Sequence, residues 1–169
     1  LPAQTTTPAA ASDVRKELIG QIEDAERKLV ALAEATPPDK YGWRPAAGVR
    51  SVSEVYMHIV GANYLFPGIV GHKRPADVAL TRESEKTVTD KAQVLDYLRK
   101  SFAFAKQAAM SVPEQELGTS VNMFGSPSTK RGVLVLLATH AHEHLGQSIA
   151  YARMNGVVPP WSRGTDGDR

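Results

Sequence analysis

Three of the chain's five histidines fall within one short stretch, at positions 140, 142 and 144. Successive residues of an α-helix turn by about 100°, so His140 and His144 would lie on one helix face, about 40° apart, whereas His142 would point away. Two imidazoles at this spacing can bind a single metal ion. The stretch therefore predicts part of a metal site on a helix, with His142 outside it.

His58 is the candidate for a third ligand. It lies between Val55 and Ala62, in a segment whose apolar residues recur at three- and four-residue steps, so a helix would place it on the core-facing side. Neighbouring buried imidazoles repel one another if protonated, and a divalent cation would bind their neutral lone pairs. We therefore predict a metal site formed by His58, His140 and His144. The alternative is that all three are packing residues of a plain structural bundle.

The absence of cysteine limits the chemistry of this site. With no cysteine in the chain, a metal must be bound through nitrogen and oxygen ligands, and a cysteine nucleophile is excluded. Three histidine ligands leave a coordination position open, which is typical of catalytic zinc sites. Such an ion could activate water for hydrolysis or bind an external thiol as thiolate. The prediction is a metal-dependent enzyme, and the alternative is a non-catalytic metal- or ligand-binding bundle.

Two further residues are candidates for catalysis. Gln147 shares the helix face of His140 and His144, so it could donate a hydrogen bond to bound water or substrate; alternatively, it only ties two helices together. Glu54 lies one turn before His58 and could approach the ion. The alternative for Glu54 is that it only completes a capping box with Ser51, in which each side chain bonds a free backbone N–H at the helix start.

The elements that must position these side chains are all helical. Apolar periodicity predicts four helices, over residues 13–34, 51–70, 90–110 and 127–154, and no segment has the pattern of a sheet. The predicted N-caps are Ser12, Ser51, Thr89 and Ser126, the last followed by Pro127 in the favoured first-turn position. Four helices with one apolar face each predict an all-α four-helix bundle. The long segment at residues 71–89 predicts a crossover between the second and third helices.

Length and charge restrict the remaining possibilities. The chain of 169 residues suits one domain, which we place at residues 12–161, between flexible segments at 1–11 and 162–169. Twenty Lys and Arg against 18 Asp and Glu argue against a nucleic-acid surface, and no apolar run suffices for a membrane span. The expected partner is a small-molecule substrate. The uncharged Pro- and Thr-containing start resembles that of a mature secreted protein, so exported and cytoplasmic locations both stay open.

The chain resembles the DinB-like family, which includes the YfiT-like proteins, over residues 14–161. The resemblance rests on Trp43-Arg44-Pro45 and on two later segments, GVRSVSEVYMHIVGAN and THAHEHLGQSIAYARMNGVVPP. It places His58 in the pattern S-x-x-E-x-x-x-H-I. The pattern H-x-x-x-H-x-G-Q covers His140, His144, Gly146 and Gln147.

This resemblance implies a fold and a range of activities. Members of the family are four-helix bundles that bind Zn²⁺ or Ni²⁺ through three histidines, often as homodimers. Some resemble S-transferases or isomerases that use low-molecular-weight thiols, and others are described as metal-dependent hydrolases. For this chain, the resemblance implies zinc or nickel on His58, His140 and His144, a hydrolase or thiol-transferase activity, and a homodimer.

Overall fold

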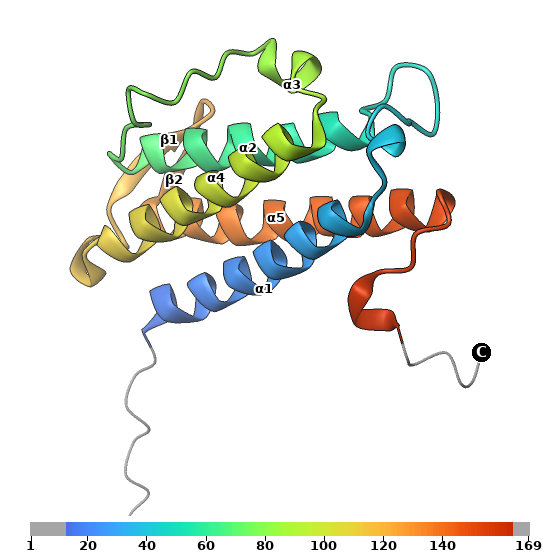
Figure 1. Ribbon diagram of the computed structural model, residues 1–169. Helices are drawn as coiled ribbons and strands as arrows, with labels where there is room; N and C mark the ends of the chain where they lie inside the picture. Colours follow the sequence, from blue (N-terminus) through green and yellow to red (C-terminus); the bar gives the residue numbers. More distant parts are fainter. Residues whose placement is uncertain (1–12, 164–169) are drawn as a thin grey trace, which may run out of the picture.

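Four long helices pack into a bundle, as predicted (Figure 1). The structure is a computed structural model that describes residues 13–163. The predicted flexible segment at residues 1–11 lies outside this range, as does most of the predicted tail, although Ser162 belongs to the short 3₁₀ helix η3 (Pro160–Ser162). The four long helices are α1 (Val14–Ala35), α2 (Val52–Ile69), α4 (Lys91–Ser111) and α5 (Lys130–Met154).

The segment between α2 and α4 is the predicted crossover. It spans residues 70–90 and contains the single-turn helix α3 (Ser84–Thr87). Figure 1 shows that α2 and α4 run in the same direction, as do α1 and α5. Each of α1 and α2 packs against both α4 and α5. The crossover therefore returns the chain to the end of the bundle where α2 began, and the topology is not a simple alternation of up and down.

The helix starts follow from local hydrogen bonds. At α2 the predicted capping box is confirmed, because the Ser51 hydroxyl accepts from the Glu54 N–H and the Glu54 carboxylate accepts from the Ser51 N–H. Two of the other three predicted caps are one residue early. Asp13 caps α1, while Ser12 lies outside the described residues, and Asp90 rather than Thr89 caps α4. Aspartate is as good an N-cap as serine or threonine, so neighbouring candidates compete.

The predicted start of the last helix is wrong. The sequence predicted a helix from Pro127 with Ser126 as its N-cap, and no sheet, but β1 (Ser120–Met123) and β2 (Ser126–Thr129) form an antiparallel hairpin. Helix α5 begins only after β2, with Thr129 as its N-cap. A Ser-Pro pair fits a helix start, and a short edge strand tolerates it equally well. Local propensity could not separate the two.

The hairpin turn places an aromatic side chain at the surface. Phe124 and Gly125 have φ angles of 55° and 89°, and the Asn122 side chain accepts a hydrogen bond from the Gly125 N–H. Positive φ at both central residues matches the twist of the flanking strands, although it is unusual for phenylalanine. The ring of Phe124, which is 64% exposed, lies 5.9 Å from that of Phe66 in α2. The hairpin therefore contacts the bundle near the C-terminal end of α2.

Helix α2 is buried on more than one side. The five apolar residues that recur at three- and four-residue steps around His58 form a stripe, and all are buried; so are Met57, Val60 and Tyr64, which lie outside that stripe. Leu80 of the crossover belongs to the same apolar cluster, and α3 packs against α2. The confirmed stripe consists of Val52, Val55, Ile59, Ala62 and Phe66. Because the crossover packs against α2 from outside the bundle, α2 is buried over more of its circumference than a helix with a single apolar face.

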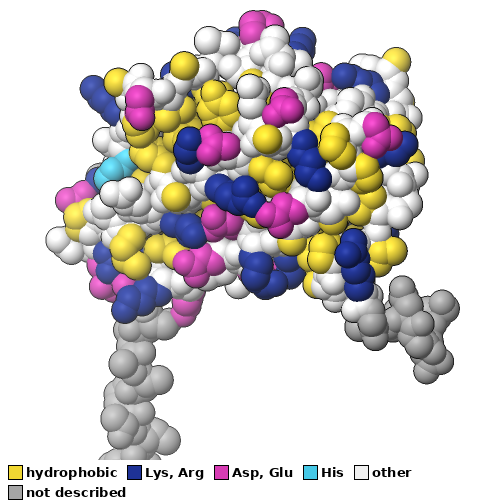
Figure 2. Space-filling model, viewed as in Figure 1, with side chains coloured by type: hydrophobic (Ala, Val, Ile, Leu, Met, Phe, Trp, Pro, Cys, Tyr) yellow, Lys and Arg dark blue, Asp and Glu magenta, His cyan; other side chains and the backbone are white. Residues whose placement is uncertain are grey.

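The exposed surface mixes both signs of charge. On the face shown in Figure 2, Lys and Arg side chains alternate with Asp and Glu, and apolar side chains are scattered among them. Among residues 13–163, no helix is long and apolar enough to cross a membrane.

The capping box gives a first testable prediction. Replacing Ser51 with alanine should lower the free energy of unfolding by about 1 kcal/mol, because the Glu54 N–H loses its partner at the start of α2. Urea denaturation followed by circular dichroism measures this change. Ser126→Ala, at an exposed hairpin position, is the control and should stay within about 0.5 kcal/mol of the wild type. Equal effects of the two substitutions would show that the cap is not stabilising.

Candidate metal centre

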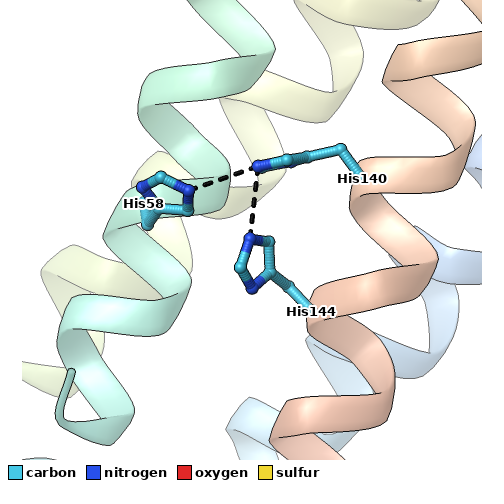
Figure 3. Close-up of side chains that lie close together, drawn as sticks. All are labelled: His58, His140 and His144. Atoms are coloured by element: carbon cyan, nitrogen blue, oxygen red, sulfur yellow. Dashed lines mark hydrogen bonds between the residues drawn. The ribbon is translucent and has the colours of Figure 1, made fainter. Parts of the chain in front are cut away.

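Three imidazole rings from two helices converge on one point. His58 comes from the middle of α2, and His140 and His144 come from consecutive turns of α5. The Nε2 atom of His140 lies 3.2 Å from Nε2 of His58 and 3.2 Å from Nε2 of His144 (Figure 3). One nitrogen of each ring lies within 4.8 Å of those of the other two. The structure therefore brings together the three histidines that the sequence predicted as a metal site.

The spacing of these nitrogens fits a common cation. In a tetrahedral site with Zn–N bonds of roughly 2.1 Å, two ligand nitrogens are separated by roughly 3.4 Å. The two distances of 3.2 Å from His140 are close to this value. Little movement of the rings would be needed for all three Nε2 atoms to contact one ion.

Hydrogen bonds on the far side of the rings leave lone pairs at the centre. Nδ1 of His58 faces the Glu85 carboxylate at 3.1 Å, and Nδ1 of His144 faces the amide oxygen of Gln147 at 2.8 Å. Both partners are acceptors, so both Nδ1 atoms carry the proton and both Nε2 atoms carry a lone pair. His140 Nε2 lies between these two lone pairs and can donate at most one proton. At least one of these two lone pairs therefore has no hydrogen-bond donor, and a divalent cation at the centre would bind it.

Electrostatics also favour neutral imidazoles. Burial, followed by the neighbouring His144 and His58, lowers the pKa of His140 to about 3. The pKa of His58 is lowered as well, chiefly by burial and then by the charge of Arg50, although Glu85 opposes this shift. Both rings are therefore neutral at physiological pH, which is the state that binds a metal.

Glu85 is the functional residue that the sequence did not indicate. It lies on α3 in the crossover, where one carboxylate oxygen accepts from His58 and the other from Arg50 Nε at 2.7 Å. A carboxylate that accepts from a ligand histidine fixes the orientation of the ring and raises its basicity. Twenty-seven residues separate Glu85 from His58, so no periodicity could have paired them. The middle of α2, the residue before its N-cap and the crossover meet at this carboxylate.

Gln147 supports His144 from the same helix. Its amide oxygen accepts from His144, and its amide nitrogen donates to the hydroxyl of Tyr151 at 3.1 Å. The Tyr151 ring in turn packs edge-on against Trp43, with centroids 5.4 Å apart. Both ends of the Gln147 amide are thus occupied by protein groups. These contacts give Gln147 a positioning role, and the catalytic role predicted for it stays a prediction.

The other residues singled out in the sequence lie outside the cluster. Glu54 contacts the Ser51 N–H and Arg44, so its capping role is confirmed, whereas its catalytic role stays a prediction. His142 donates through Nδ1 to the Ala138 carbonyl and is not part of the three-histidine group, as predicted. His72, in the crossover, is half-buried, and its Nε2 lies 2.9 Å from the Ser111 hydroxyl.

An open cleft borders the cluster. Its volume is about 980 Å³, and His58 and His140 lie in its wall, whereas His144 is 92% buried behind them. Phe66 packs edge-on against His140, with centroids 5.3 Å apart, and forms part of the same wall. The remaining walls come from α2 and from the crossover around α3. A small molecule in this cleft can therefore reach two of the three imidazoles.

Known proteins share the sequence pattern and the fold of this chain. The sequence matches the DinB superfamily over residues 21–148. A conserved protein from Enterococcus faecalis superimposes with a TM-score of 0.70 at 17% identity, covering 85% of this chain and 98% of that chain. A DinB-like protein from Bacillus subtilis gives 0.66 at 22% identity, covering 84% and 93%. No curated protein matches the chain.

A third solved structure has a described activity. YfiT from Bacillus subtilis superimposes with a TM-score of 0.67 at 17% identity, covering 94% of this chain and 97% of that chain. It is described as a probable metal-dependent hydrolase with an unusual four-helix bundle topology. At these identities, the likeness to the solved structures shows the shared fold alone.

The low pKa of His140 predicts how the metal-free protein responds to acid. Below about pH 6.5 the unfolded chain binds a proton at His140, but the folded protein does not until about pH 3. The unfolded state therefore binds more protons in this range, and stability falls as the pH falls. We expect the melting temperature of chelator-treated protein to decrease between pH 6.5 and 5, and to decrease less for His140→Gln. Equal slopes for the two proteins would contradict the buried, neutral His140.

Proposed function

The chain belongs to the DinB superfamily, and from this premise we propose that it is a metal-dependent hydrolase of small molecules, with its divalent ion bound by His58, His140 and His144. The observation that carries the proposal is the convergence of three Nε2 atoms beside an open cleft. The description of YfiT as a probable metal-dependent hydrolase supports it from a protein of the same fold.

The residues around the proposed metal site would have different roles. When bound, a divalent ion supplies Lewis-acid chemistry, making water a better nucleophile at neutral pH. His58 and His140 would hold the ion at the cleft wall, and His144 would hold it from the buried side. Glu85 and Gln147 keep the protons of His58 and His144 on Nδ1, away from the ion. Phe66 excludes water from one side of His140.

The open cleft favours an enzyme over a structural metal site. Structural zinc sites are closed by four protein ligands, whereas this cluster has three histidines and two of them line a cleft. A transferase that uses an external low-molecular-weight thiol has the same site requirements and stays a prediction. The choice between zinc and nickel and the formation of a homodimer also stay predictions.

Metal binding tests the proposal directly. Full-length protein loaded with Zn²⁺ or Ni²⁺ and then desalted should retain one ion per chain, measured by elemental analysis and titration calorimetry. His140→Ala should lose this stoichiometric binding, because His140 is the ligand between the other two. The matched control is His142→Gln, on the same helix but outside the cluster, and it should bind like the wild type.

Activity is measured on the same samples. Metal-loaded wild type and His142→Gln should hydrolyse members of a panel of small esters and amides, and metal-free protein and His140→Ala should not. A parallel assay of thiol conjugation identifies a transferase instead. No turnover above that of metal-free protein in any class would refute the proposed enzyme, and failure of the wild type to retain metal would refute the site itself.

The contact between Glu85 and His58 gives a separate prediction. Glu85→Ala should weaken metal binding by about 10- to 100-fold, because the His58 ring loses the carboxylate that orients it. The control is Glu83→Ala, an exposed carboxylate two residues away that contacts no histidine. Calorimetric titration with Zn²⁺ compares the two variants. Similar affinities would mean that the crossover carboxylate does not support the site.

A further inference from the structure

The cleft beside the three histidines carries an unusual share of the protein's charge. Four cationic side chains line it, and Glu85 is its one carboxylate. With neutral histidines, the lining has an excess of three positive charges, whereas the net charge of the whole chain is only +2. The rest of the surface therefore carries no positive excess. The cationic residues are Arg50, Arg74, Arg82 and Lys86.

These cations differ in how they are held. Arg50 is fixed by the carboxylate of Glu85, which also bonds His58, so one cation stands next to the proposed metal ligands. Arg74 donates from Nη1 to the Leu80 carbonyl, and its remaining N–H groups stay available. Arg82 precedes α3 and Lys86 lies on it, and both side chains are exposed. Arg50 is thus held next to the histidines, whereas the other three side chains keep N–H groups available for a ligand. We call these four residues the cationic wall of the cleft.

The part of the cleft formed by α2 is apolar, which further restricts the ligands that would fit. Met57, Leu65 and Phe66 line the cleft from α2, and Leu80 closes it from the crossover. Leu65 is 56% exposed even though its neighbours on α2 are largely buried. An exposed leucine and a phenylalanine in a cleft that is also lined by four cations would favour a ligand that has both an apolar body and an anionic group.

We propose that the cleft binds a small organic anion, with a carboxylate or phosphate group against Arg50, Arg82 and Lys86 and an apolar body against α2. This proposal names the chemical class of the ligand, and it rests on the proposed function only in taking that ligand to be the substrate. Carboxylates and phosphates share the chemistry that the wall offers, because guanidinium and ammonium groups form charge-assisted hydrogen bonds with both. The anionic group would direct the apolar part of the molecule past His58 and His140.

Binding of three probes to the full-length, metal-free protein tests this inference. Phenylacetate and phenyl phosphate carry the two anionic groups, and phenylacetamide is the neutral counterpart of the first. We expect at least one anion to bind about tenfold or more tightly than the amide at low ionic strength, and the preference to shrink with added salt. Amide signals of Gly61 and Gly68, which line the cleft, should shift in NMR titrations. The tighter of the two anions identifies the group.

A pair of double variants locates the effect. Arg82→Gln with Lys86→Gln removes two charges from the cleft and should weaken anion binding by about tenfold or more, leaving the amide unchanged. Lys16→Gln with Arg153→Gln removes the same charge from exposed positions elsewhere and should change anion binding less than about twofold.

Three outcomes would overturn the inference. These are equal binding of the anions and the amide, equal losses in both double variants, and signal shifts that avoid Gly61 and Gly68. The measurements need neither metal nor turnover, so they are independent of the hydrolase. Metal-dependent turnover without any preference for anions would refute the anionic ligand alone. Anion binding without turnover would refute the hydrolase and leave the anion site standing.

Discussion

The site depends on the packing of α2 against α5, because that contact alone brings three Nε2 lone pairs together. His58 on one helix and His140 on the other approach to 3.2 Å only while both helices keep their register. Protonated imidazoles would repel one another at this distance. Neutral imidazoles leave at least one hydrogen bond unmade, because His140 Nε2 can donate to only one of the two neighbouring Nε2 atoms. The fold therefore holds the three imidazoles in a geometry that a cation would stabilise.

The orientation of each outer ring is set by a different part of the chain. Gln147 supports His144 from within the same helix, three residues further along the chain. Glu85 supports His58 from the crossover, far away in sequence. His140, between them, packs against the ring of Phe66. A local contact, a long-range contact and an apolar contact thus fix three rings, which explains how a partly open site can stay ordered.

The crossover has several functions at once. It permits parallel α2 and α4 (Figure 1). It also packs Leu80 into the apolar cluster of α2 and places Glu85 beside His58. It also supplies Arg82 and Lys86 to the wall of the cleft. A simple alternating bundle with short loops would leave α2 exposed and the cleft without this wall. The path of the crossover is therefore what forms an open cleft beside the three histidines.

The sequence by itself determined the four helices, the capping box at Ser51, and the identity of the three converging histidines, because all of these follow from contacts within about four residues or from one repeated apolar face. It placed the start of α5 wrongly, since Ser126 and Pro127 suit a helix start and an edge strand alike. Only the tertiary structure decided that Glu85 supports His58 and that four cations share one cleft. Those residues meet through the path of the crossover, and periodicity within a helix carries no information about where a long connection will pack.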